Sequence, residues 1–149
     1  MLYRIKNNYS KNVLTLTPSG KMGIHRATLE EYSEEVDKRS IWQLSPNHNR
    51  IDTGSFSLKL IGTAAWICHL DEFTENDVDY TTLQGAPEHL HNPIVFEFDQ
   101  IDGTNLFRIY HSNKRQKLIE YIDAQGRYYP ALADSEHANQ TDSWSVLEV

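Results

Sequence analysis

The chain has 149 residues, of which 39% are hydrophobic and 23% are charged, and its formal net charge is −7. A chain of this size and composition can bury its own core, so we expect one globular domain over residues 1–149. The acidic charge disfavours nucleic acid and anionic membranes as partners, because their phosphates would repel it. The N-terminus turns polar at once and no segment reaches ~20 apolar residues, so we expect a cytoplasmic protein without signal peptide or membrane span.

The first strand signal is Tyr3-Arg4-Ile5, in which apolar and polar residues alternate as in a half-buried strand. A second apolar run follows at 13–16, and a third at 41–44 contains a tryptophan. Pro18-Ser19-Gly20 predicts a hairpin turn after the second run. Residues 28–38 place apolar side chains at helical spacing, so we expect a short helical turn there or, alternatively, a charged loop.

The same order returns with Phe56-Ser57-Leu58, followed by apolar runs at 66–70 and 95–98. Between these two runs lies an acid-rich segment, 71–79, which we interpret as a long loop. Cys68 is the single cysteine of the chain, so an intrachain disulfide is excluded, and its apolar neighbours predict a buried, inert thiol.

A third copy of the pattern begins with Phe107-Arg108-Ile109 and continues through apolar runs at 118–122 and 143–147. Ala124-Gln125-Gly126 predicts a tight turn within its hairpin. The three copies span about residues 1–50, 51–102 and 103–149, and a period of roughly 50 residues is typical of a repeated architecture.

Three such units of short strands, each closing on an aromatic residue, resemble the β-trefoil. In that all-β fold six strands form a short barrel and six form hairpins that cap one end. The resemblance implies that the residues repeated at equivalent positions fill the barrel core, namely Ile5, Trp42, Leu58, Phe96, Ile109 and Trp144. Lectins, protease inhibitors, fascins and cytokines share this fold, so function must be argued from individual residues.

No catalytic motif stands out. The chain has no G-x-S-x-G, no Walker loop, no G-x-G-x-x-G and no H-E-x-x-H. His89 and His91 have the spacing of two metal ligands on one face of a strand, but Gly85 and Pro87 place them in a loop. The acidic segment 71–79 lacks the spacing of an EF-hand. We therefore expect no enzyme activity, no cofactor and no metal.

The third repeat is similar to ricin-B-type lectins of the small fungal kind. Those lectins place an acidic residue early in a repeat, an aromatic residue after the hairpin, and an amide before a closing Q-x-W. Here Asp142-Ser143-Trp144 stands in place of the Q-x-W. The resemblance implies a site for a glycan or glycoprotein made of Glu120, Tyr128, Tyr129, His137, Asn139 and Gln140.

Protease inhibition is the alternative function. Fungal trefoil inhibitors have about this length and also lack the Q-x-W. Basic residues in three expected turns, Lys21, Arg115 and Arg127, are candidates to enter a trypsin-like pocket. A rigid barrel that presents such a loop would reduce the entropy lost on binding a protease.

Overall fold

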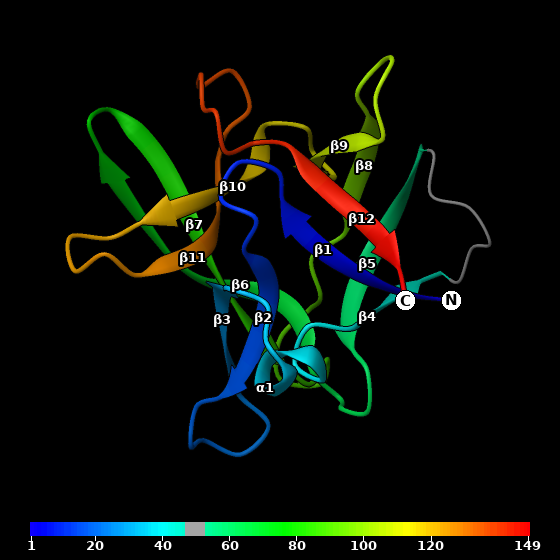
Figure 1. Ribbon diagram of the computed structural model, residues 1–149. Coiled ribbons are helices and arrows are strands. Elements are labelled where there is room, and N and C mark those ends of the chain that lie inside the picture. Colours follow the sequence, from blue (N-terminus) through cyan, green and yellow to red (C-terminus); the bar gives the residue numbers. More distant parts are fainter. Residues whose placement is uncertain (47–52) are drawn as a thin grey trace.

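The computed structural model of the protein describes residues 1–46 and 53–149 (Figure 1). Strands account for nearly all of its regular structure, and one short helix joins them. In chain order the elements are β1 (Leu2–Asn7), β2 (Val13–Pro18), β3 (His25–Glu30), α1 (Glu34–Asp37), β4 (Trp42–Ser45), β5 (Thr53–Leu60), β6 (Trp66–Glu75), β7 (Val78–Ala86), β8 (Phe96–Gln100), β9 (Leu106–His111), β10 (Gln116–Ile122), β11 (Tyr128–Asp134) and β12 (Trp144–Glu148).

Six of these strands close into a barrel. β1 pairs with β12, β12 with β9, β9 with β8, β8 with β5, β5 with β4, and β4 pairs again with β1, all antiparallel. Figure 1 shows β1 and β12 side by side, with the two chain ends close together. The Val149 amide donates a hydrogen bond to the Leu2 carbonyl at 2.9 Å, so the two termini seal the ring of strands.

The other six strands form three hairpins, β2–β3, β6–β7 and β10–β11. The middle hairpin joins them, because β7 pairs with β3 at its C-terminal end and with β11 further toward its start. Each repeat expected from the sequence therefore supplies two barrel strands and one hairpin. The expected boundary at residues 50 and 51 lies outside the described residues.

The barrel core is the one that the repeat pattern predicts. Trp42 and Trp144 are fully buried, and their indole N–H groups donate to the carbonyls of Leu14 and Leu118 at 3.1 and 3.0 Å. These are equivalent bonds in the first and third repeats. Phe96 occupies the same place in the second repeat and is also fully buried. The predicted core residues Ile5, Leu58 and Ile109 are buried as well.

One expectation about the fold is wrong. The acid-rich segment 71–79 is not a loop, because β6 runs on to Glu75 and β7 begins at Val78. Asn76 and Asp77 form the turn between them with φ of 51° and 63°, the backbone that a two-residue hairpin turn requires. Phe73, which lies between the acidic residues, packs against the ring of Tyr80 and gives the segment an apolar face.

Three smaller expectations are confirmed. Residues 34–37 form the short helix α1, and the Ser33 hydroxyl caps it by accepting a hydrogen bond from the Val36 amide. Cys68 is fully buried, as predicted, and burial raises the pKa of its thiol, which favours the protonated form. His89 and His91 lie exposed in the loop between β7 and β8.

Candidate ligand-binding site

Glu120 belongs to the packing of the fold. Its residue is only 4% exposed, and its Oε2 accepts hydrogen bonds from Ser10 Oγ at 2.7 Å and from Asn12 Nδ2 at 3.1 Å. Both donors come from the turn between β1 and β2. The carboxylate thus ties the first repeat to the third, and this oxygen is already hydrogen-bonded within the protein.

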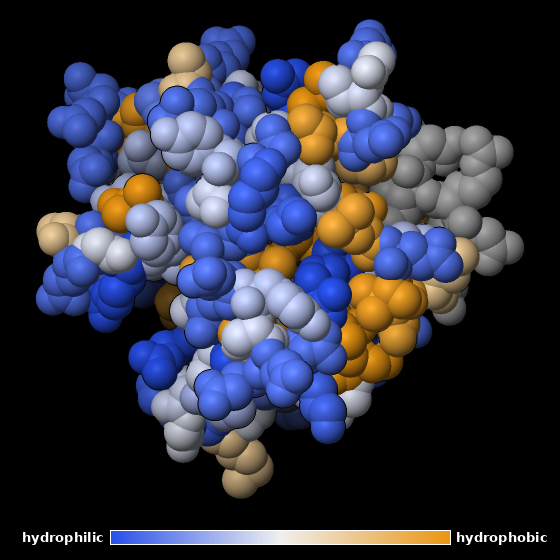
Figure 2. Space-filling view, in the orientation of Figure 1, coloured by the Kyte–Doolittle hydropathy of each residue, from blue (hydrophilic) through white to orange (hydrophobic). Residues whose placement is uncertain are grey.

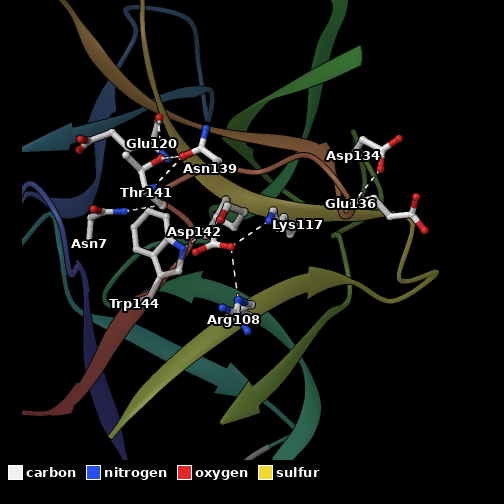
Figure 3. A network of polar contacts seen from close by, with 11 residues as sticks. Asn7, Arg108, Lys117, Glu120, Asp134, Glu136, Asn139, Thr141, Asp142 and Trp144 are labelled. Atoms are coloured by element: carbon white, nitrogen blue, oxygen red, sulfur yellow. Dashed lines mark hydrogen bonds and ion pairs between the residues drawn. The ribbon is translucent and has the colours of Figure 1, made fainter. Parts of the chain in front are cut away.

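Asn139 lies close to Glu120, as the sequence predicts, but its side chain shapes the local loop. Its Oδ1 accepts the Thr141 backbone N–H at 2.7 Å and lies 2.6 Å from the Thr141 hydroxyl. The same hydroxyl accepts the backbone N–H of Glu120 at 3.1 Å (Figure 3). His137 lies in a turn, and its backbone N–H donates a hydrogen bond to the Asp134 carbonyl. Gln140 is exposed.

A buried ion pair beside this loop was not expected from the sequence. Lys117 Nζ lies 2.8 Å from Asp142 Oδ2, and the two side chains are only 7% and 14% exposed. The more exposed Arg108 approaches the same oxygen at 3.3 Å (Figure 3). Asp142 stands two residues before Trp144, so the pair holds the chain where it enters the closing strand.

Tyr128 and Tyr129 lie at the tip of the hairpin, just before Pro130, which pairs with Glu120, and they line a cavity of about 530 Å³. All three repeats contribute to its walls. The first repeat supplies residues of the β2–β3 turn and of β3, the second supplies Leu70 and residues 82–84, and the third supplies residues 127–129. Tyr128 and Tyr129 are the sequence-predicted site residues that this cavity includes.

The strand register explains how both tyrosines reach this end. Tyr128 pairs with Ile122 and Tyr129 pairs with Tyr121. Because neighbouring residues of a strand alternate, the two side chains point to opposite faces of the hairpin. Tyr129 packs against Tyr121 with ring centroids 5.2 Å apart, whereas Tyr128 is 41% exposed. Burial raises the pKa of Tyr129 above its usual value. Neither tyrosine hydroxyl forms a hydrogen bond within the described part of the chain.

Tyr129 belongs to an aromatic cluster that also contains Phe73, Tyr80 and Tyr121. The Tyr121 hydroxyl donates to Glu75 Oε2 at 2.9 Å, and burial together with this carboxylate raises its pKa to about 12. The cluster therefore joins the second and third hairpins and holds Tyr129, which it shares with the cavity wall.

Comparison with solved structures identifies the architecture. ThreeFoil, a designed threefold-symmetric protein, superposes with a TM-score of 0.72 at 11% identity over 99% of both chains. The ricin B-like lectin of Macrolepiota procera, solved with lactose, gives 0.66 at 14% identity over 100% of this chain and 96% of the lectin. The protein described as the BEL β-trefoil gives 0.66 at 12% identity, over 99% of this chain and 92% of that one. The chain is a β-trefoil. No protein-family model matches its sequence, and no curated protein is similar to it in sequence.

In this β-trefoil the cavity lies between the turns of the first and third hairpins and the middle of the second hairpin, at Leu70 and residues 82–84. Sequence reasoning placed the Gly126 turn and the tyrosine pair in one hairpin, but it did not bring the Gly20 turn to the same site. A signal was present, because both glycines occupy the same position in their repeats, at φ of 88° and 77°. Threefold pseudo-symmetry places equivalent turns around one axis, so the two turns had to share one end of the molecule.

Two other cavities of this β-trefoil have a different chemical character. One, of about 330 Å³, includes Glu72 and Asp79 in its walls, and the other, of about 350 Å³, includes Asp99 and Asp102. The described residues contain no group of three histidine, cysteine or acidic side chains placed to hold a metal ion. No helix among them is long and apolar enough to cross a membrane.

Proposed function

We propose that this protein is a carbohydrate-binding protein without catalytic activity, and that the sugar binds in the cavity lined by Tyr128 and Tyr129. The observation that carries the proposal is the exposed ring of Tyr128 at the edge of a 530 Å³ cavity. A sugar presents a patch of C–H groups that packs on an aromatic face, and its hydroxyls need a few fixed polar partners. The free hydroxyls of both tyrosines supply such partners.

The fold supports the same function. The Macrolepiota procera lectin, whose structure contains lactose, shares the architecture of this chain over its whole length. One shallow stack with two or three hydrogen bonds typically gives a Kd between about 1 µM and 1 mM. We therefore expect weak binding to a single sugar unit.

The proposal retains only part of the site predicted from the sequence. Tyr128 and Tyr129 remain, because both residues line the cavity and neither hydroxyl has a hydrogen-bond partner among the described residues. Glu120 and Asn139 are assigned to the fold, since their side-chain oxygens already accept hydrogen bonds from the chain itself. His137 and Gln140 have no role in this binding mode.

The test is a glycan array followed by NMR titration of a glycan that binds. We expect chemical-shift changes centred on Tyr128 and Tyr129, and a loss of affinity of at least about tenfold on Tyr128→Ala, the order of one stacking contact. Tyr9→Ala is the matched control, because Tyr9 is 60% exposed and lies in the β1–β2 turn beside the partners of Glu120. Loss of binding on Tyr9→Ala alone would place the sugar near Glu120 and contradict the proposal.

Protease inhibition is a second candidate, and the β2–β3 turn is the observation that favours it. Lys21 is exposed and forms no ion pair within the described residues, and Met22 beside it is 95% exposed. Arg127 fits the role less well, because its side chain is bound to Asp123 at 2.8 Å. Arg115 lies in a tight turn, and its backbone carbonyl accepts a hydrogen bond from the Ser135 N–H.

A panel of serine and cysteine proteases tests this candidate. Sub-micromolar inhibition that disappears on Lys21→Ala, with Arg115→Ala as the control, would select inhibition over carbohydrate binding. Inhibition that is equal in both variants would exclude the β2–β3 turn as the reactive loop.

A further inference from the structure

The cavity at the hairpin ends is basic, although the protein as a whole is acidic. The chain carries a formal net charge of −7. The cavity nevertheless includes Lys21, Arg26 and Arg127 in its walls and no aspartate or glutamate. The other two cavities include two acidic residues each, Glu72 and Asp79 in one and Asp99 and Asp102 in the other. Among these three cavities, this one combines basic residues with no acidic residue in its wall.

Two of the three cations are available to a ligand. Lys21 and Arg26 are exposed and form no ion pair within the part of the chain that the structure describes. Arg127 binds the Asp123 carboxylate through Nε at 2.8 Å, which fixes its orientation and offsets part of its charge. Lys21 and Arg26 come from the β2–β3 hairpin, so the charge lies on the wall contributed by the first repeat.

The neutral polar groups of the cavity are mostly engaged within the fold. The Gln84 amide nitrogen donates to the His69 carbonyl at 3.1 Å, and the Ser19 hydroxyl donates to the Ile24 carbonyl at 2.8 Å. The Thr28 hydroxyl donates to Glu30 at 2.8 Å. What remains for a ligand is the ammonium of Lys21 and the guanidinium of Arg26, which only donate, with His25 and the phenol groups of the two tyrosines, which can donate or accept.

A donor-rich, positively charged cavity complements a ligand that is rich in acceptors and negatively charged. Guanidinium groups bind carboxylate and sulfate through paired N–H donors, and bonds to charged acceptors are about twice as strong as neutral ones. A neutral sugar would leave both cations of the first repeat without a partner. Tyr128 and these cations line the same cavity, so a saccharide packed on its ring can present an acidic group to them.

We propose that the saccharide bound here is acidic, with a carboxylate or sulfate held by Arg26 and Lys21 while the sugar ring packs on Tyr128. This inference rests on the proposed carbohydrate binding and adds the chemical class of the ligand. Figure 2 shows a mostly hydrophilic surface on the side of the hairpin ends, whereas hydrophobic residues gather over the barrel. A hydrophilic surround suits a charged sugar that enters from water.

The test compares three probes that share one disaccharide. Lactose, 3′-sialyllactose and 3′-sulfolactose are titrated by NMR and calorimetry at low salt and again in ~0.3 M NaCl. We expect both acidic probes to bind at least about tenfold more tightly than lactose, with the difference reduced by salt as an exposed charge contact requires. The relative affinity of the sialylated and sulfated probes distinguishes a carboxylate site from a sulfate site.

Arg26→Gln and Lys21→Gln should each reduce the preference for acidic probes over lactose by about threefold to tenfold, the order of one charge-assisted hydrogen bond. Arg115→Gln, at an exposed cation outside the cavity, is the matched control and should change nothing.

Equal affinity for lactose and the acidic probes would overturn the acidic preference and leave carbohydrate binding intact. A preference that survives in both cavity variants would also overturn it. If no probe and no glycan on the array shifts Tyr128 or Tyr129, then the carbohydrate proposal itself is wrong.

Discussion

The two ends of the β10–β11 hairpin use their polar residues in opposite ways. Toward the base, over residues 117–120, the charged side chains of Lys117 and Glu120 are buried and bound to Asp142, Ser10 and Asn12. At the tip, residues 122–128, Tyr128 is 41% exposed and its hydroxyl is free. One hairpin thus has a structural end and an end available to a ligand.

The difference follows from what surrounds each end. The base meets the β1–β2 turn and the loop before β12, and these segments bring polar groups that complete every bond. The tip faces the β2–β3 turn, β3 and the middle of the β6–β7 hairpin across a cavity. Because a buried charge must be paired whereas an exposed one need not be, position along the hairpin decides which residues can serve a ligand.

The largest effect is expected at the base from Trp144→Ala. The ring is fully buried and its N–H donates to the Leu118 carbonyl, so its removal leaves both a cavity and an unpaired acceptor. The expected loss is about 3–5 kcal/mol in the free energy of unfolding. Chemical denaturation measures it, with Tyr128→Ala at the tip as the control, which should cost under about 1 kcal/mol. Similar losses in both variants would contradict the division between base and tip.

The next largest effect is expected from Lys117→Met, which leaves the Asp142 carboxylate in a largely buried position. Removing one member of a buried pair costs about 3–5 kcal/mol, and the low end applies here because Arg108 stays beside Asp142. Denaturation measures the loss. The double variant Lys117→Met, Asp142→Leu should recover most of it, since no unpaired charge remains. A double variant less stable than the single one would show that the pair itself stabilises the fold.

The fold could be predicted from the sequence largely because its strands alternate. Every apolar run named there falls on a strand to within one residue, and Trp42 and Trp144 are buried as the repeat pattern requires. The full length of the hairpin in the second repeat was missed, because the acidic residues around Phe73 and before Tyr80 are typical of a loop. Those rings form an apolar face only by packing against Tyr121 of another repeat.

The candidate site was less predictable, because each residue's role depends on partners distant in the chain. Glu120 has the acidic side chain that a sugar-binding site would use. Its carboxylate is nevertheless bound by Ser10 and Asn12, which come from the other end of the sequence. No local pattern reveals such contacts. Tyr128 could be found, because strand alternation after a glycine turn is a local property.

Glu120→Ala should have an intermediate effect and separates the two ends most directly. It leaves the donors of Ser10 and Asn12 without their acceptor, so we expect a loss of about 1–3 kcal/mol in the free energy of unfolding. Glu120→Gln keeps an acceptor oxygen and should lose less. Glycan affinity should be unchanged in both variants when measured by titration at a temperature where they are folded. A stable variant that no longer binds glycan would return Glu120 to the binding site.

The smallest effect is expected at the tip, where the Asp123 carboxylate accepts the backbone N–H groups of Gln125 and Arg127, each at 2.9 Å. The bond from the Arg127 amide is the main cause that lowers the pKa of Asp123 below its usual 3.8. A carboxyl whose pKa is lower in the folded protein than in the unfolded chain stabilises its turn at higher pH. That contribution is lost as the pH falls through the folded pKa. NMR should therefore show the Arg127 amide shifting with a midpoint below 3.8, while the Trp144 indole N–H at the base stays constant. Asp123→Asn should abolish the shift. A midpoint at or above the usual value would show that the turn does not bind this carboxylate, and with it that Arg127 is as free as Lys21 to meet a ligand.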